Sequence, residues 1–162
     1  RRMTKDCVEP AVRLPASVCD LERHLVRRRA GLRGLLALDA EDRWGRPDAE
    51  RTAAMDREAR ELRAAITEAE AEVARRVAEL RTTDPELLEA WIAAQEALLE
   101  AFEAELDRAP DPDRVRTERH VARQEREDWG KVRAGRLAFV DQNDFYVRVP
   151  RALYHALFGF EP

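Results

Sequence analysis

The sequence predicts a mainly α-helical protein centred on an antiparallel, coiled-coil-like helical hairpin, and three observations support this fold class. Apolar residues recur at steps of three and four over long stretches, as one buried face of a helix requires. Charged residues make up 38% of the 162 residues, a share typical of long, solvated helices. The chain has only 6 Gly and a single serine, too few turn-forming residues for a β-sandwich or barrel.

The predicted organisation has three parts. Residues 1–15 contain two prolines and no helical periodicity, so we expect an extended arm there. Residues 16–133 are expected to form a helical bundle that includes a long hairpin over 48–108. Residues 134–162 are expected to form a small β-hairpin followed by a short helix.

A helical stretch precedes the hairpin. Ser17 and Asp20 have the spacing of a capping box, and apolar residues follow at helical intervals. Gly31 and Gly34 are expected to weaken this helix, because glycine lowers helix propensity.

The first arm of the predicted hairpin is a helix that begins near Asp48. Its apolar seam has a coiled-coil-like spacing and consists of Met55, Ala59, Leu62, Ile66, Ala69, Val73, Val77 and Leu80. Thr83 or Asp84 can cap a second helix that has Pro85 in its first turn. We therefore expect a tight turn and an antiparallel pair, with one kinked helix through Pro85 as the alternative.

The second arm of the hairpin is wide on its apolar side. Two rows of apolar residues run beside each other between Leu87 and Leu106, which is more than one neighbouring helix can cover. We therefore expect this face to bind another protein chain, together with the aromatic residues of the C-terminal segment. The predicted interface residues are Leu88, Ile92, Leu99, Phe102, Leu106, Phe145, Tyr146, Tyr154, Phe158 and Phe160.

Charge is distributed unevenly along the chain, whose net charge is −4. Residues 1–46 contain 11 basic and 7 acidic residues, whereas residues 47–110 contain 8 basic and 17 acidic residues. In a hairpin that turns near residue 83, basic residues of the first arm face the acidic end of the second arm. The expected ion pairs join Arg60 and Arg63 to Glu103, Glu105 and Asp107.

One basic cluster offers an alternative binding site, for nucleic acid. It consists of Arg23, Arg27, Arg28, Arg29 and Arg33. These side chains recur at the spacing of a helical turn and can contact phosphates. The competing interpretation is ion pairing with other helices. A further hypothesis is that the acidic arm mimics nucleic-acid charge and inhibits a basic target, through residues such as Glu96, Glu100 and Glu103.

The C-terminal part combines a third helix with a predicted β-hairpin. Residues 113–133 have a thin apolar stripe at helical spacing. Residues 137–140 and 145–149 are expected to form two short strands joined by the polar turn 141–144, with Phe145, Val147 and Val149 on one face. Pro150 is placed to open a short helix that ends at Phe158, with Gly159 as its C-terminal cap.

No catalytic, cofactor or metal motif is recognised in the sequence. There is no glycine-rich phosphate loop and no G-x-S-x-G around Ser17. Cys7, Cys19 and His24 match no common zinc module. Two cysteines are too few for a disulfide framework, and no apolar run approaches the length of a membrane span.

These observations favour a protein that is cytoplasmic, is not an enzyme, has no cofactor and binds no membrane. The predicted function is a non-catalytic structural or adaptor subunit that assembles with itself or with other proteins.

Overall fold

The computed structural model describes residues 16–44, 49–140, 145 and 148–159, and it leaves the side chains of 16–19, 39–44, 151 and 154 undescribed. All regular secondary structure in these described residues is helical, which confirms the prediction of a mainly α-helical protein. The helices are α1 (Ala16–Trp44), α2 (Ala49–Thr83), α3 (Pro85–Leu106), α4 (Pro112–Arg133) and α6 (Arg151–Phe158).

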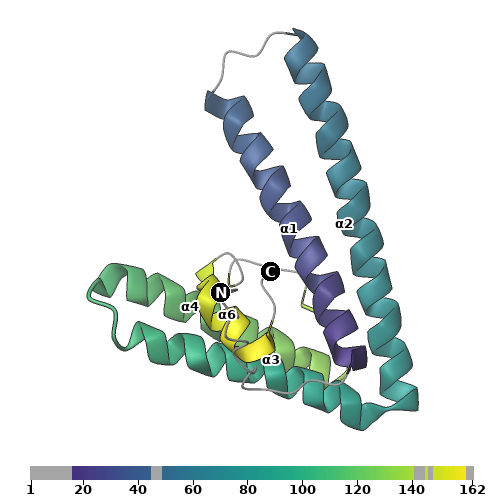
Figure 1. The fold of residues 1–162 in the computed structure, drawn as a ribbon, viewed down its shortest axis with the longest axis vertical. Helices are drawn as coiled ribbons and strands as arrows, with labels where there is room; N and C mark the ends of the chain where they lie inside the picture. Colours follow the sequence, from purple (N-terminus) through teal and green to yellow (C-terminus); the bar gives the residue numbers. More distant parts are fainter. Residues whose placement is uncertain (1–15, 45–48, 141–144, 146–147, 160–162) are drawn as a thin grey trace, which may run out of the picture.

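The helices form two antiparallel hairpins that meet at an angle (Figure 1). α1 packs along α2, and α3 packs along α4. The α1–α2 hairpin extends away from the shorter α3–α4 hairpin, and α6 lies against α3. The antiparallel partner of α2 is therefore α1, and the hairpin predicted over residues 48–108 is not formed.

The length of the connections explains this pairing. Only Asp84 separates α2 from α3, and an antiparallel reversal of two helices needs about 2–5 connecting residues. The side chain of Asp84 caps α3 by accepting a hydrogen bond of 3.1 Å from the backbone N–H of Leu87, and Pro85 occupies the first turn. The two helices thus change direction at Asp84 without folding back on each other, which also excludes the single kinked rod.

The core lies around α3, whose two apolar rows are both buried inside the chain. α3 contacts α4, α2, α6 and α1, so several neighbours share the width that one helix could not cover. The indole of Trp91 meets that of Trp129 in α4 edge-on, with 5.0 Å between ring centroids. The rings of Phe102 and Phe145 pack in the same way, also at 5.0 Å.

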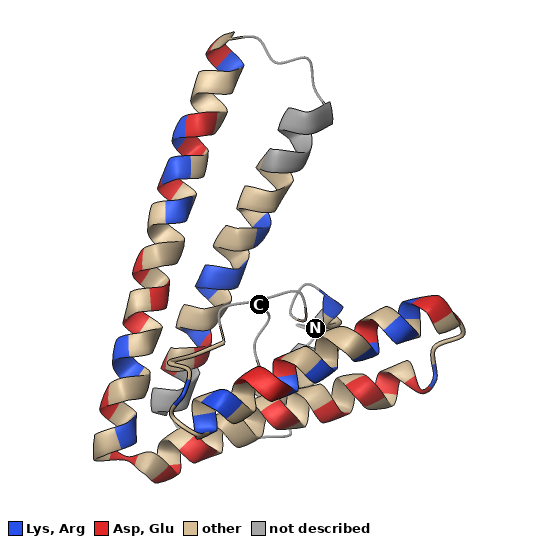
Figure 2. Cartoon of the chain, turned by 180° about the vertical axis from the view of Figure 1, so that it is seen from behind, with Lys and Arg blue, Asp and Glu red and all other residues tan. Residues whose placement is uncertain are grey.

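Acidic and basic residues lie along both α3 and α4 (Figure 2), and ion pairs at seven-residue intervals join the two helices. Arg126 pairs with Glu103 at 3.0 Å, and Arg133 pairs with Glu89 at 2.9 Å and with Glu96 at 2.5 Å. Arg119 pairs with Asp107. The prediction that Arg60 and Arg63 bind Glu103, Glu105 and Asp107 is therefore wrong, because α4 rather than α2 lies beside this edge of α3.

The predicted β-hairpin over 137–149 is also wrong for the residues that the structure describes there. Residues 137–140 contain no strand, with bends at Ala138 and Phe139, and Phe145 and Arg148 have helical geometry. The backbone N–H of Val149 donates to the carbonyl of Phe145 at 3.1 Å, which is the four-residue step of a helix. Residues four apart lie on one face both in a strand and in a helical turn, so the spacing of Phe145 and Val149 fits either structure. Both side chains are buried, and burial against α3 favours the helical turn over the strand.

Two further helix ends, the start of α4 and the end of α6, are capped by neighbouring residues. Asp111 caps α4 by accepting from the backbone N–H groups of Asp113 and Arg114. Gly159, with φ of 79°, ends α6 in the left-handed conformation that glycine adopts most readily. The short helix predicted from Pro150 to Phe158 is confirmed.

Candidate functional site

The predicted interface residues lie mostly in the protein's own core. The five on α3 are at most 7% exposed, and Phe145 and Phe158 are 2% and 5% exposed. The five are Leu88, Ile92, Leu99, Phe102 and Leu106. Tyr146, Phe160 and the side chain of Tyr154 lie outside the described residues. The width of α3 is used inside the chain, so it gives no reason to expect a partner at this face.

The predicted arginine cluster is divided between the interior and the surface of α1. Arg23 and Arg27 are exposed and Arg33 is half-buried, but Arg28 and Arg29 are only 4% and 1% exposed. Two of the five guanidinium groups are therefore inaccessible to a nucleic-acid phosphate. The interpretation as helix-to-helix ion pairs fits these two.

Arg28 and Arg29 connect α1 to three other parts of the chain. The Nε of Arg28 donates to Glu70 in α2 at 3.0 Å, and its guanidinium lies 5.5 Å from the centre of the Phe139 ring. The Nη2 of Arg29 lies 3.6 Å from Oε1 of Glu125 in α4. Both arginines thus belong to the junction between the two hairpins.

A second buried carboxylate, that of Glu22 in α1, completes this junction. It accepts hydrogen bonds from the indole of Trp91 and from the amide of Gln95, both in α3. In addition, Arg81 of α2 donates to the carbonyl of Val132 in α4 at 2.8 Å. The two hairpins are therefore joined by buried polar contacts as well as by a shared apolar core, to which α1 contributes Leu21 and Leu25 and α2 contributes Val73 and Val77.

The acidity of Glu125 is changed by its position within the junction. Its burial raises the pKa of the carboxyl group to about 7, although Arg29 and the hydrogen bond from the Trp129 indole both act to lower it. A perturbed acid can mark a catalytic site when it lines a cleft. Glu125 is instead enclosed by the side chains that join the hairpins, so we assign it a structural role.

The α1–α2 hairpin, called the arm below, has a long apolar seam that the other described helices do not completely cover. On α2, Val73 and Val77 are buried near α3, but towards the far end Met55, Leu62 and Ile66 are only half-buried. On α1, Leu36 is 53% exposed. Figure 1 shows that, among the described helices, only α1 and α2 run along this stretch. Two helices alone leave part of their seam in contact with water.

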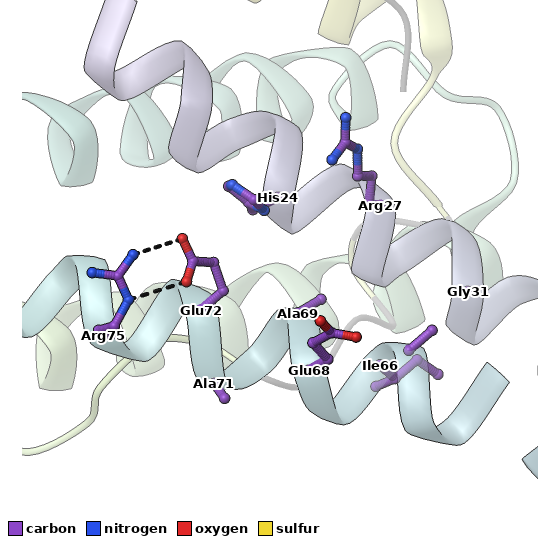
Figure 3. Close-up of a pocket in the computed structure, with 10 residues that line it drawn as sticks. His24, Arg27, Gly31, Ile66, Glu68, Ala69, Ala71, Glu72 and Arg75 are labelled. Carbon is purple, nitrogen blue, oxygen red and sulfur yellow. Dashed lines mark hydrogen bonds and ion pairs between the residues drawn. The ribbon is translucent and has the colours of Figure 1, made fainter. Parts of the chain in front are cut away.

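A groove of about 620 Å³ runs between α1 and α2 on one face of the arm (Figure 3). Its apolar floor includes Gly31, Ala65, Ile66 and Ala69, and its rim includes His24, Arg27, Glu68, Glu72 and Arg75. A Cβ at position 31 would lie 3.2 Å from Cγ1 of Ile66, so glycine allows α1 to approach α2 closely here. We select this groove as the candidate functional site.

Comparison of the chain with protein-family models, with curated proteins and with solved structures finds no match.

The charged groups on the groove rim differ in how far they are neutralised. Arg75 and Arg76 donate hydrogen bonds to Glu72 and lower the pKa of its carboxyl group to about 2. Partial burial, together with nearby Arg76, lowers the pKa of His24, so its imidazole is neutral near pH 7. Within the part of the chain that the structure describes, Arg27 and Glu68 have no ion-pair partner. They leave one positive charge on the α1 side of the groove and one negative charge on the α2 side.

Two other classes of site receive no support from the described residues. This part of the chain contains no group of three or more His, Cys, Asp or Glu side chains placed to hold a metal ion. Cys7 and the side chain of Cys19, which were considered as metal ligands with His24, lie outside the described residues. No helix in the described ranges is long and apolar enough to cross a membrane.

The sequence contains a signal for the groove in the small residues of α1 and α2. Gly31 and Gly34 were interpreted as weak points of a helix, whereas both face α2, with a close approach at Gly31 and an ordinary contact distance at Gly34. Ala65 and Ala69 lie one helical turn apart on the facing side of α2. Small residues on both of two neighbouring helices indicate a close contact or a groove, once the helices are known to be neighbours.

Proposed function

We propose that the chain is a non-catalytic structural or adaptor protein that assembles with protein partners through the arm. The observation that supports this proposal is the incomplete cover of the arm's apolar seam, set against the burial of most apolar side chains of α3. The binding surface differs from the one expected from the sequence, because α3 is already covered within the chain.

The energetics of burial favour a partner at the arm. Complete burial of a Leu, Ile or Met side chain stabilises by about 1.5–3 kcal/mol relative to full exposure. The half-buried residues of the arm therefore retain part of this free energy for an association. Ile66 lines the groove, so a helix placed along it removes apolar surface of this side chain from water.

Site-specific photo-crosslinking in the native cells tests the proposal. A photoreactive phenylalanine analogue at Ala65, in the groove, is expected to give covalent adducts with protein. The same analogue at Ala90 serves as a matched control, since both alanines are exposed on helices and Ala90 lies on α3. Adducts at position 65 and none at position 90 support the proposal. Absence of adducts at 65, or equal adducts at both positions, overturns it.

A further inference from the structure

The occupant of the groove can be argued from the charges on its two sides. Arg27 lines the groove from α1, and Arg23 lies one helical turn away on the same side of that helix. Glu68 lines the groove from α2, and Glu61 lies seven residues away on the same side of α2. All four side chains are exposed. Glu72 and Arg75 also line the groove from α2, but they pair with each other, so the remaining charges give a positive edge on α1 and a negative edge on α2.

These edges have few partners within the described chain. Arg23 lies 3.8 Å from Asp20, a long contact between two exposed groups. Arg27, Glu61 and Glu68 have no ion pair within the described residues. Along α3 and α4, by contrast, charges at the same seven-residue spacing are paired from helix to helix. The arm thus presents the side-chain pattern of a helix pair that no further helix covers within the described part of the chain.

We infer that the occupant is a second copy of this chain, whose arm packs on the groove face of the first to form a four-helix bundle. This inference rests on the proposed function. A two-fold axis places α1 of each copy beside α2 of the other, so each positive edge meets a negative edge. A partner with charge of one sign would match one edge and be repelled by the other. The small residues of the floor allow the helices of the two copies to approach closely.

The inference is tested with the purified full-length protein by sedimentation velocity over a range of concentrations. The wild-type chain is expected to form a dimer. Two charge-reversal variants, R23E/R27E and E61R/E68R, each place like charges together at both edges of a symmetric dimer. Each is expected to raise the dimer dissociation constant by about tenfold or more. Circular dichroism verifies that both variants retain the helical fold.

Mixing the two variants provides the decisive measurement. In a mixed dimer every reversed edge faces a reversed edge of opposite sign, so equimolar mixing is expected to restore a dimer of wild-type affinity. The control variant R116E/R123E changes exposed arginines of α4 and is expected to dimerise as the wild type does.

The outcomes separate this inference from the proposed function. A wild-type chain that stays monomeric, reversal variants that dimerise normally, or a mixture that fails to dimerise would each overturn the second-copy inference. If the chain is monomeric but position 65 still crosslinks in cells to a protein of different mass, the arm binds another protein. In that case the proposed function stands and the second-copy inference is rejected.

Discussion

The two hairpins of the molecule differ in how far they bury apolar residues and pair charged ones. In the α3–α4 hairpin, the apolar rows of α3 are buried, and Arg126 and Arg133 reach acidic residues on the neighbouring helix. In the arm, the apolar seam of α2 is half-buried from Ala69 back to Met55. Several charged residues there, including Arg27 and Glu68, have no ion pair within the described residues. Both hairpins have apolar seams flanked by charge, so composition alone does not separate them.

The two hairpins differ in the number of other helices that contact them. α3 contacts four other helices, whereas along the far part of the arm, within the described residues, α1 and α2 contact only each other. A helix pair becomes a complete core when further helices cover its seam. The α3–α4 hairpin receives that cover from its own chain, and we propose that the arm receives it from a partner.

The largest expected difference comes from the same substitution in the two hairpins. Leu98→Ala removes a completely buried side chain from α3 and is expected to lower the free energy of unfolding by about 2–5 kcal/mol. Leu62→Ala, in the half-buried seam of α2, is expected to cost about 1 kcal/mol in dilute protein. Urea denaturation measures both. Equal losses would show that the arm is as well covered as α3, which would contradict the comparison.

The junction between the hairpins is expected to respond to pH through Glu125. Burial raises its pKa to about 7 in the folded state from 4.5, so folding takes up a proton. Stability from this group is therefore fully present below about pH 4.5 and is lost as pH rises through 7, by about 3 kcal/mol in total. Arg29, Arg28 and Asp128 are the charged groups that act on it.

Glu125→Gln isolates this contribution. The unfolding free energy of the wild type minus that of the variant is expected to fall as pH rises from 4 to 9, because other groups titrate equally in both proteins. Urea denaturation at several pH values measures the difference. A difference that stays constant with pH would show that Glu125 keeps an ordinary pKa.

Two glycine substitutions sharpen the description of the arm. At position 34 an added Cβ would lie 3.8 Å from Leu62, an ordinary contact, so Gly34→Ala is expected to stabilise by about 0.5–1 kcal/mol through helix propensity. At position 31 the distance to Ile66 is 3.2 Å, so Gly31→Ala is expected to gain less. Thermal unfolding of both variants checks the order. A larger gain at position 31 would place α1 further from α2 than the structure does.

The smallest effect is expected from the charges on the surface of the α3–α4 hairpin. A double-mutant cycle of Arg126→Ala and Glu103→Ala is expected to give a coupling energy of about 0.2–1 kcal/mol that decreases with added salt. Arg57→Ala on the arm is the matched single change, expected to be close to neutral because Arg57 has no ion pair within the described residues. A coupling energy of zero would show that the paired charges of α3 and α4 do not distinguish the two hairpins energetically.

The helices and most of their ends were predictable because their determinants are local. The seam from Met55 to Leu80 predicted one long helix, and the structure contains it within α2. The capping carboxylate of Asp84 with Pro85 behind it, and Gly159 after Phe158, act within a single helical turn and placed their boundaries correctly. The prediction of a β-hairpin failed because Phe145 and Val149 fit both a strand and a helical turn, and only burial against α3 distinguishes the two.

Apart from the stretch around Phe145 and Val149, the sequence by itself therefore determined where the described chain is helical and that its helices are amphipathic, since propensity, periodicity and capping act over one or two turns. Only the tertiary structure decided which helices pair, because that depends on linker length and on which arrangement buries the most apolar surface. The single residue between α2 and α3 redirected α3 to α4 and left α1 to α2. The face left without cover was consequently on the arm, although α3 is the more apolar helix.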